Sequence, residues 1–310
     1  MISLILAAGK GTRMKSEKPK VLHEVNGMPM LKRVVKVLED SGIEKNLFIL
    51  GHKKEVVLEA MGDVMYVEQK EQLGTGHAVL IAKEKLGNLK EDVLITCGDT
   101  PLLKSETFNK MKKIFEEQNL DCIVLSCKVK NPFGYGRIIK ENGNIVDIVE
   151  EKEATDEQRK IDEINTGVYI FKNEKLLEAV EKINNNNSKG EYYLTDVIKI
   201  LSGEGQKVES FQIEDEDEVL GVNSKVQLAQ ANRILRERKN VKDFSYVASI
   251  EEIESNNFNL SVNTYTEKED TSEKIDIKVL NNQIQEIIKK NDFLRKEIDR
   301  LIKDLEVENE

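Results

Sequence analysis

The sequence predicts an α/β fold built on a Rossmann-like, mostly parallel sheet that is flanked by helices. Short apolar runs alternate with helical patterns between residues 2 and 129, and this alternation favours a parallel sheet with helices on both faces. Glycine-containing loops at 9–11 and 98–99 directly follow two of the apolar runs. Ligands bind beyond the carboxyl ends of the strands in such sheets, so we expect these loops to form one site.

The first apolar run, residues 2–8, predicts a buried strand. It is too short to span a membrane, and no basic segment precedes it as in a signal peptide. The elements that follow are predicted from apolar periodicity and from glycine or polar residues at their ends. We expect strands at 46–51, 65–69, 92–99 and 122–129, and helices at 29–42, 76–87 and 105–118.

The pattern changes at Gly134. The pair Asn142-Gly143 lies between alternating runs and predicts a β-hairpin. Further elements are expected as a strand at 165–172 and helices at 191–201 and 224–239. We therefore expect the second half to form an insertion or lobe that closes over a substrate held by the first half.

The last part of the chain predicts a C-terminal helical coiled-coil extension. Apolar residues repeat at heptad spacing from Ile277 to Leu305, and Asn291 occupies one seam position, which favours a parallel dimer. Ile288 and Ile302 widen the apolar face and favour packing into a bundle or against another protein's helices. The predicted division is a domain at 1–238, an irregular linker at 239–275 and the coiled-coil helix at 276–306.

Composition excludes several classes of protein. The formal net charge of the 310 residues is −10, which argues against a nucleic acid partner, since such proteins usually carry a basic face. Three cysteines without C-x-x-C spacing fit a reducing cytoplasm, and the histidines and cysteines lack zinc-ligand spacing. We expect a cytoplasmic protein that neither crosses nor binds a membrane.

The loop after the first strand has the composition of a phosphate site. Gly9 and Gly11 allow backbone N–H groups to approach an anion. Met14 replaces the third glycine of the dinucleotide fingerprint, and the chain contains no Walker loop. Five cations lie within 11 residues: Lys10, Arg13, Lys15, Lys18 and Lys20. A tight turn in a basic surface loop is the alternative, but glycines and cations together favour a phosphate ligand.

Longer motifs carry a resemblance to a known family. The string LAAGKGTRM, followed by EKPKVLHEVNGMPML, resembles the signature of sugar-1-phosphate nucleotidyltransferases. Further motifs follow in order and resemble the uridyltransferase part of bacterial bifunctional UDP-N-acetylglucosamine pyrophosphorylases/glucosamine-1-phosphate acetyltransferases: EQLGTGHA, GDTPLL, GYGRII, VEEKEAT, EINTGVYIF, GEYYLTD and GVNSKVQLAQA. The resemblance covers about residues 1–238 and implies a fold of the nucleotide-diphospho-sugar transferase type.

The resemblance implies a reaction and a cofactor. A uridylyl group passes from UTP to N-acetylglucosamine 1-phosphate with Mg²⁺, which gives UDP-N-acetylglucosamine, a cell-wall peptidoglycan precursor, and pyrophosphate. The sugar phosphate attacks the α-phosphorus in line and is already an anion, so no Ser/His/Asp set is expected. UTP and N-acetylglucosamine 1-phosphate are therefore the expected partners.

The resemblance also implies roles for individual residues. Arg13 and Lys20 are the expected catalytic residues, because they neutralise the triphosphate and the charge that develops. Asp99 and Asn223 are the expected metal ligands, although spacing alone leaves both as cap or turn residues. Asn223 and Lys20 also belong to the expected substrate-binding set, which further contains Leu6, Ala7, Ala8, Gly9, Gln69, Gly74, Thr75, Gly98, Gly136, Glu150 and Asn165.

Within this set the residues divide between the two substrates. Gln69 is expected to hydrogen-bond the uracil, and Gly74 and Thr75 to close around it, since an amide both donates and accepts. Gly136, Glu150 and Asn165 are expected at the sugar. Tyr192 and Tyr193 are expected to serve core packing, with a place near the sugar as the alternative.

The resemblance stops near Lys239. No hexapeptide β-helix repeats follow, so we expect acetyltransferase activity, and the trimer that such repeats form, to be absent. Residues 244–265 and the acidic stretch behind them resemble the C-terminal segment of type I restriction-modification methyltransferase subunits; a generic acidic coiled coil is the alternative. Two other functions stay open: a non-enzymatic assembly module that carries the coiled coil, and a nucleotidyltransferase for another sugar phosphate.

Overall fold

A computed structural model describes residues 1–238 and residue 294. The predicted linker, the coiled coil and the segment 244–265 lie outside the described residues, apart from Leu294. Residues 1–238 fall within one compact unit. No helix of this described part is long and apolar enough to cross a membrane.

The central sheet has its strands in the order β11-β7-β10-β6-β1-β4-β5. Within the described residues its strands are β1 Ile2–Ala7, β4 Asn46–Leu50, β5 Met65–Glu68, β6 Val93–Cys97, β7 Cys122–Lys128, β8 Arg137–Glu141, β9 Asn144–Val149, β10 Glu163–Phe171 and β11 Val208–Ile213. Strands β6, β1, β4 and β5 run parallel, as does β11 with β7. The mostly parallel sheet predicted from the sequence is confirmed, with β10 antiparallel to both of its neighbours.

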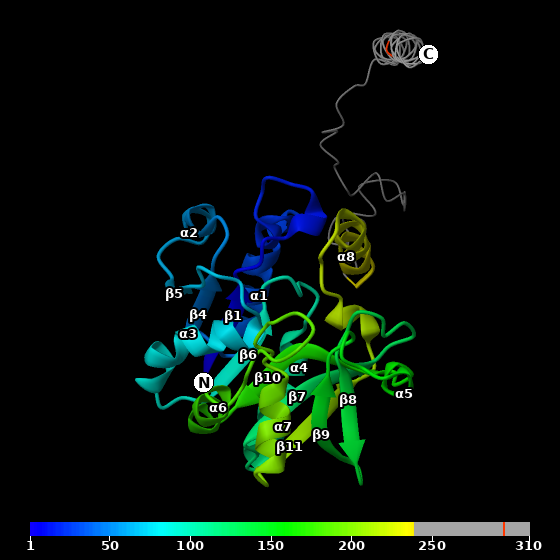
Figure 1. Cartoon of the computed structure of the whole chain (residues 1–310). Coiled ribbons are helices and arrows are strands. Elements are labelled where there is room, and N and C mark those ends of the chain that lie inside the picture. Colours follow the sequence, from blue (N-terminus) through cyan, green and yellow to red (C-terminus); the bar gives the residue numbers. More distant parts are fainter. Residues whose placement is uncertain (239–293, 295–310) are drawn as a thin grey trace, which may run out of the picture. The chain divides into compact units, whose positions relative to one another are not determined.

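Helices cover both faces of the sheet (Figure 1). Their bounds are α1 Met30–Asp40, α2 Lys54–Met61, α3 Thr75–Gly87, α4 Ser105–Glu117, α5 Asp156–Arg159, α6 Asn173–Val180, α7 Asp196–Gly203 and α8 Lys225–Arg238. Side chains alternate across each strand, so Leu4 packs with α3, α6 and α7 while Ile5 packs with α1, α2 and α4. The core is therefore two apolar layers with the sheet between them.

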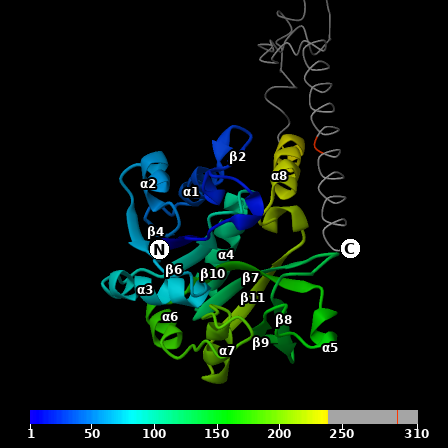
Figure 2. The same cartoon turned by 45° about the horizontal axis from the view of Figure 1, so that its top comes forward.

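A third apolar cluster holds α8 against the small β-ribbon β2 Glu24–Val25 and β3 Met28–Pro29. Val25, Ala231 and Ile234 are buried there, and Figure 2 shows α8 beside β2. Asn26 donates its backbone N–H to the Asn232 side chain at 2.8 Å. This contact places the segment before α8 close to the loops that follow β1 and β6.

The second half of the chain differs from the prediction. It is not a separate lobe, because β10 lies between β6 and β7 inside the central sheet. The β8–β9 hairpin forms as expected, with positive φ at both Asn142 and Gly143, and pairs with β10 through Arg137 and Ile164. The hairpin and α5 lie on the opposite side of the molecule from β5 and α2 (Figure 1, Figure 2).

The helix expected at 191–201 begins only at Asp196. Residues before it are held by backbone hydrogen bonds to another loop, since Tyr192 donates to Leu73 O and accepts from Gly76 N, both at 2.8 Å. A residue engaged in these contacts does not hydrogen-bond within a helix. The segment 191–195 is therefore a loop that reaches the start of α3.

Candidate functional site

The site begins where the parallel strands end. In the sheet, Leu6 lies opposite Cys97, Ala7 opposite Leu50, and Leu50 opposite Glu68. Gly98, just after β6, donates its N–H to Leu6 O of β1 at 3.0 Å, and Gln69, just after β5, donates its N–H to Leu50 O of β4 at 2.7 Å. The residues Gly9 and Asp99 that follow β1 and β6 line one cavity. The predicted meeting of the loops after β1 and β6 is thus present in the structure.

A cavity of about 340 Å³ opens at this edge of the sheet. Its volume is in the range of small-molecule sites. Ten of the residues expected at the site line it: Leu6, Ala7, Ala8, Gly9, Lys20, Gln69, Gly74, Thr75, Asp99 and Glu150. Gly9 has open space where a side chain would project, so a ligand can approach the backbone there.

Lys20 connects the charged groups of the site. It begins the 3₁₀ turn Lys20–Leu22, which buried Val21 and Leu22 anchor in the core. Its ammonium group forms an ion pair with Asp99 and donates to Asn223 Oδ1 at 3.0 Å. Both side chains of the ion pair are only 15% exposed, so their charges are weakly screened by solvent.

The loop that carries Lys20 requires glycine at position 11. Gly11 has φ +61°, and a Cβ there would lie 2.6 Å from Lys20 Cβ. A side chain at this position would both strain the backbone and displace the lysine. The G-x-G pattern therefore contributes to the placement of Lys20.

Asn223 reaches the same point from the far end of the domain. Val222 N donates to Asp99 O at 2.8 Å, and Asn223 N donates to Gln227 Oε1 at 2.9 Å. These bonds fix the segment before α8 beside the end of β6. The structure thus brings together three expected residues that are separated by 79 and 203 positions in the sequence.

The oxygens of Asp99 and Asn223 converge on one cation, the Lys20 ammonium. A carboxylate and an amide oxygen are suitable ligands for Mg²⁺, which commonly takes one or two protein ligands and completes its shell with phosphates and water. The described part of the chain contains no group of three or more His, Cys, Asp or Glu side chains placed to hold a metal by themselves. The residues present therefore fit a magnesium ion that substrate phosphates help to bind.

Gln69 forms another wall of the cavity. Its side chain is 5% exposed, and Nε2 donates to Gly74 O at 3.0 Å and lies 3.1 Å from His77 Nδ1. Because these contacts occupy the amide nitrogen, the amide oxygen is the atom that remains to accept a hydrogen bond from a ligand. His77 has a structural place in this arrangement, as it holds the Gln69 amide.

Glu150 marks the other side of the cavity. It accepts a hydrogen bond from Thr195 Oγ1 at 3.2 Å. Burial raises the pKa of Glu150 above its ordinary value, and the negative charges of Glu191 and Glu153 act in the same direction. The carboxyl group can therefore bind a polar ligand group either as an acceptor or, when protonated, as a donor.

Five expected residues do not line the cavity itself. Asn223 contacts Lys20 of the cavity wall but does not line the cavity itself. Gly98 lies behind the wall, where a Cβ on this glycine would lie 2.9 Å from Leu31 Cδ1. Gly136 O accepts from Asn165 N at 2.8 Å, and Asn165 Nδ2 donates to the Tyr169 hydroxyl at 2.7 Å. Arg13 is exposed, and no contact within residues 1–238 joins its guanidinium to the other site residues.

The cavity also contains residues outside the expected set. Lys189 and Tyr193 line it, and the Lys189 ammonium lies 5.8 Å from the centre of the Tyr193 ring. The Tyr193 hydroxyl is buried and has no hydrogen-bond partner within residues 1–238, and burial raises its pKa to about 12. The two adjacent tyrosines of GEYYLTD could have indicated this contact with the cavity, but core packing was the expected role of both.

Cys97 lines the cavity beside Asp99. Burial, together with the Asp99 charge, raises the pKa of the Cys97 thiol to about 12. The thiol is therefore protonated at neutral pH and is a poor nucleophile. It forms part of the cavity wall and gives no indication of covalent catalysis.

The solved structures identify the class of fold. A UDP-glucose pyrophosphorylase complexed with UDP-glucose superposes with a TM-score of 0.61 over 77% of this chain and all of that chain, at 20% identity. At this identity the match establishes the fold alone. The mostly parallel sheet with helices on both faces is the fold of the nucleotide-diphospho-sugar transferase type.

The sequence comparisons identify the family. The family model described as nucleotidyl transferase matches residues 2–225, and the chain belongs to this family. The bifunctional protein GlmU of Streptococcus thermophilus and that of Clostridioides difficile are each 46% identical to it over 240 residues, which are 77% of this chain and 52% of the relative. The chain thus spans about half the length of the curated relatives it matches.

Proposed function

We propose that the chain transfers a uridylyl group from UTP to N-acetylglucosamine 1-phosphate and releases pyrophosphate. The observation that carries this proposal is the Lys20 ammonium held by both Asp99 and Asn223 at the edge of the cavity. The 46% identity to GlmU proteins over 240 residues supports the same choice. A domain that only carried another segment would not need these three residues together.

The nucleotide lies on the β1, β4 and β5 side of the cavity in this proposal. The backbone from Leu6 to Gly9 borders the phosphates and ribose, and Gln69 Oε1 accepts the N3–H of uracil. Cytosine has no hydrogen on N3, so the same oxygen would disfavour a cytidine nucleotide. Gly74 and Thr75 close the cavity around the base.

The acceptor lies on the side of Glu150. The carboxyl group of Glu150 binds sugar hydroxyl or acetamido groups, and Gly136 and Asn165 stand behind it, just before β8 and on β10. Tyr193 adds an aromatic wall and an unpartnered hydroxyl at the same place. The acceptor phosphate then points toward Lys20 and Asp99, where the α-phosphorus of UTP is bound.

The chemical step is a substitution at phosphorus. An oxygen of the acceptor phosphate forms a bond to the α-phosphorus, and the bond between this phosphorus and the bridging oxygen of pyrophosphate breaks. The attacking oxygen is already ionised, so no protein base takes a proton. Lys20 opposes the charge that moves toward the leaving pyrophosphate, and this preorganised charge lowers the barrier.

Mg²⁺, when bound, supplies further neutralisation of the phosphate oxygens. Asp99 and Asn223 are the residues that would hold it. Arg13, which is exposed in this structure, contributes to phosphate binding in the proposal only if its loop brings the guanidinium to the cavity. The structure therefore supports a catalytic role less for Arg13 than for Lys20.

Pyrophosphate release tests the proposed function. The full chain with Mg²⁺ should release pyrophosphate from UTP and N-acetylglucosamine 1-phosphate, and more slowly from a panel of other nucleoside triphosphates and sugar 1-phosphates. A preference for another sugar 1-phosphate would change the proposed substrate but keep the chain a nucleotidyltransferase. No release with any pair would contradict an enzymatic function and favour an assembly module.

Two predictions concern the part of the chain that follows the nucleotidyltransferase domain. The family match ends at residue 225 and therefore says nothing about the segment that resembles type I restriction-modification methyltransferase subunits. The absence of acetyltransferase activity and the association of the coiled coil remain predictions. Acetyl transfer from acetyl-CoA to glucosamine 1-phosphate by this chain would contradict the first of them.

A further inference from the structure

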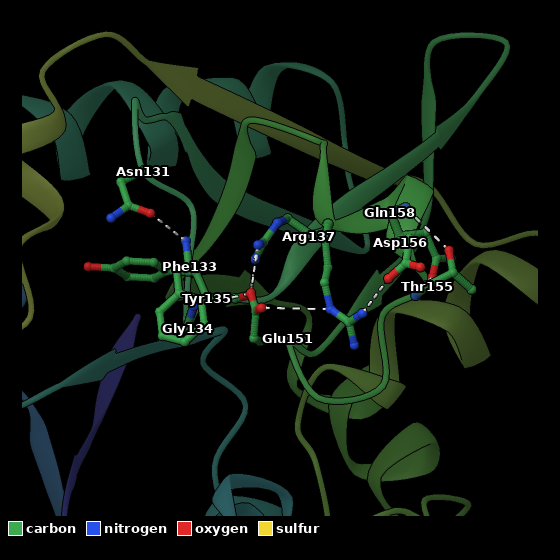
Figure 3. Close-up of polar contacts among 10 residues, drawn as sticks. Asn131, Phe133, Gly134, Tyr135, Arg137, Glu151, Thr155, Asp156 and Gln158 are labelled. Carbon is green, nitrogen blue, oxygen red and sulfur yellow. Dashed lines mark hydrogen bonds and ion pairs between the residues drawn. The ribbon is translucent and has the colours of Figure 1, made fainter.

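An ion pair joins buried Arg137 to partly exposed Glu151, next to Glu150 of the cavity wall (Figure 3). Arg137 on β8 is 1% exposed, and its guanidinium lies 2.6 Å from Glu151 Oε2, just after β9. The same carboxylate oxygen accepts the Gly134 N–H at 3.1 Å, and Arg137 also donates to Tyr135 O. The two side chains together hold the backbone of the loop 133–136.

Each member of the pair directly follows a candidate sugar contact. Arg137 follows Gly136, and Glu151 follows Glu150. A third candidate contact is tied to the same place, because Asn165 N donates to Gly136 O at 2.8 Å. Gly136 and Glu150 flank the ladder pair of Arg137 and Val149 at the end of the β8–β9 hairpin, and the ion pair ties the loop 133–136 to this end.

The loop that the pair holds forms a wall of a second cavity. This outer cavity has a volume of about 680 Å³ and is lined by Phe133, Gly134, Glu150, Glu151, Arg159 and Lys189, among others. Glu150 and Lys189 line both cavities. The loop therefore borders the space next to the carboxyl group that is assigned to the sugar.

Stability alone gives a weak reason for this arrangement. Taking two charges out of water costs free energy that a buried ion pair often only offsets, and an apolar pair of similar size would stabilise the fold as well. Burial acts to raise the pKa of Glu151, and the hydrogen bonds from Arg137 and Gly134 N outweigh it, so that this pKa lies below its ordinary value. The carboxylate is therefore ionised at neutral pH, with Oε2 bound to Arg137 and Gly134 N and with Oε1 3.8 Å from Arg159 Nε.

We propose that the Arg137–Glu151 ion pair is a positioning element for the sugar-phosphate acceptor. It ties the loop 133–136 to the residue after Glu150 and so holds this loop at the outer side of the acceptor, without either side chain touching the reacting atoms. This inference rests on the proposed function and deepens it, because it concerns one of the two substrates.

Two variants separate the length of the Glu151 side chain from its charge. Glu151→Asp keeps the charge but withdraws the carboxylate by one methylene from Gly134 and Arg137. Glu151→Gln loses the charge but keeps an oxygen that can accept from both. Positioning depends on geometry, and small misplacements are costly in rate, so Glu151→Asp should raise KM for the acceptor about tenfold. Glu151→Gln should stay within about threefold of wild type, and KM for UTP should change little in either variant.

A matched control lies on the same strand. Lys140 on β8 forms an ion pair with Glu163 at 2.8 Å, and neither residue belongs to the loop 133–136. Lys140→Ala should change the melting temperature without changing KM for the acceptor. The acceptor used for all variants is the sugar 1-phosphate that the wild-type chain turns over best, so a different sugar preference leaves the test valid.

The outcomes distinguish the two proposals. An unchanged acceptor KM in Glu151→Asp, or equal increases in KM for UTP and acceptor, would overturn the positioning role while the proposed function stands. A wild-type chain without turnover on any sugar 1-phosphate would overturn both. A selective loss of acceptor affinity in Glu151→Asp, restored in Glu151→Gln, supports the positioning role.

Discussion

Lys20 lies between two oxygen ligands at the edge of the cavity, and this makes Asp99 the residue whose replacement is most informative. Asp99→Asn keeps the size of the side chain and removes its charge. We expect kcat/KM for UTP and acceptor to fall by at least about 10²-fold, the loss typical when a preorganised electrostatic contact is removed. Initial rates of pyrophosphate release measure this, and the melting temperature shows whether the fold is retained.

Asp121 provides the control for Asp99. It also forms an ion pair with a lysine, Lys172 at 3.2 Å, but it precedes β7 at the opposite end of the sheet. Asp121→Asn should change stability and leave kcat/KM within about twofold. Full activity in Asp99→Asn would remove Asp99 from the metal and phosphate site.

Asp196 at the start of α7 predicts a pH-dependent stability. Burial, with the negative charges of Asp147 and Glu150, raises the pKa of Asp196 to about 6, and Lys199 opposes this only in part. A raised carboxyl pKa means that the folded state holds the proton more tightly than the unfolded chain. Its contribution to stability is therefore present at about pH 4 and is lost as the pH rises through about 6.

Asp196→Asn should raise the melting temperature more at about pH 8 than at about pH 4.5, because it removes a charge that the fold disfavours only when it is ionised. Thermal unfolding of both chains at the two pH values measures the difference. Asp156→Asn, an exposed aspartate at the start of α5, is the control and should show no such gain. An equal gain for Asp196→Asn at both pH values would contradict the assignment.

The residues of the site were predictable to different degrees. Lys20, Asp99 and Asn223 were expected from motifs, and the structure brings them into contact. Lys189 was not expected, because it reaches the cavity only through hydrogen bonds between distant loops, such as Leu194 N to Thr75 Oγ1 at 3.1 Å. Local sequence carries little information about a contact between segments 119 residues apart.

Among the elements, the start of α3 depends on a glycine. Gly74 has φ +108°, and a Cβ there would lie 2.4 Å from Tyr192 O. Gly74→Ala should therefore push the segment 191–194 away from α3 and disturb the Gln69 contact to Gly74 O. We expect KM for UTP to rise about tenfold and the melting temperature to fall, as for strained backbone that cannot relax.

Gly205 provides a control that separates the effect of backbone strain from the effect of the clash with Tyr192 O. It also has positive φ, +73°, but a Cβ there meets no atom within 4 Å. Gly205→Ala should lower the melting temperature and leave KM for UTP unchanged. If the two variants have the same KM, the contact between Gly74 and Tyr192 has no part in nucleotide binding.

Elements with a clear apolar pattern followed from the sequence and two with a mixed pattern did not. Strand β1 and helices α1, α3 and α4 appear within a few residues of their expected bounds, because their apolar residues form a continuous run or a helical period. Helix α2 buries only Val57, and polar residues interrupt the apolar residues of β11. Such segments take their conformation from their neighbours in the fold, as β11 does by pairing with β7.

At the scale of the whole molecule, β10 connects the proposed nucleotide side and the proposed acceptor side of the cavity. It enters the centre of the sheet next to β6 and carries Asn165, while β6 leads to Asp99. The expected closing lobe would have placed the acceptor contacts on a body that moves. The proposed acceptor contacts instead lie on the same sheet as the proposed nucleotide contacts, or on loops that leave it. We therefore expect their geometry to depend on local contacts such as the Arg137–Glu151 ion pair.

The last prediction concerns where the proposed catalytic domain ends. The cavity residues and Asn223 lie before residue 239, and Arg238 fastens the end of α8 by donating to Leu102 O at 2.7 Å and pairing with Asp215 at 2.8 Å. A chain truncated after residue 238 should keep kcat/KM within about twofold of the full chain. One truncated after residue 230 loses buried Ala231 and Ile234 and should lose stability and the placement of Asn223. Initial rates and melting temperatures of the two truncated chains decide this, and inactivity of the longer one would show that the tail takes part in catalysis.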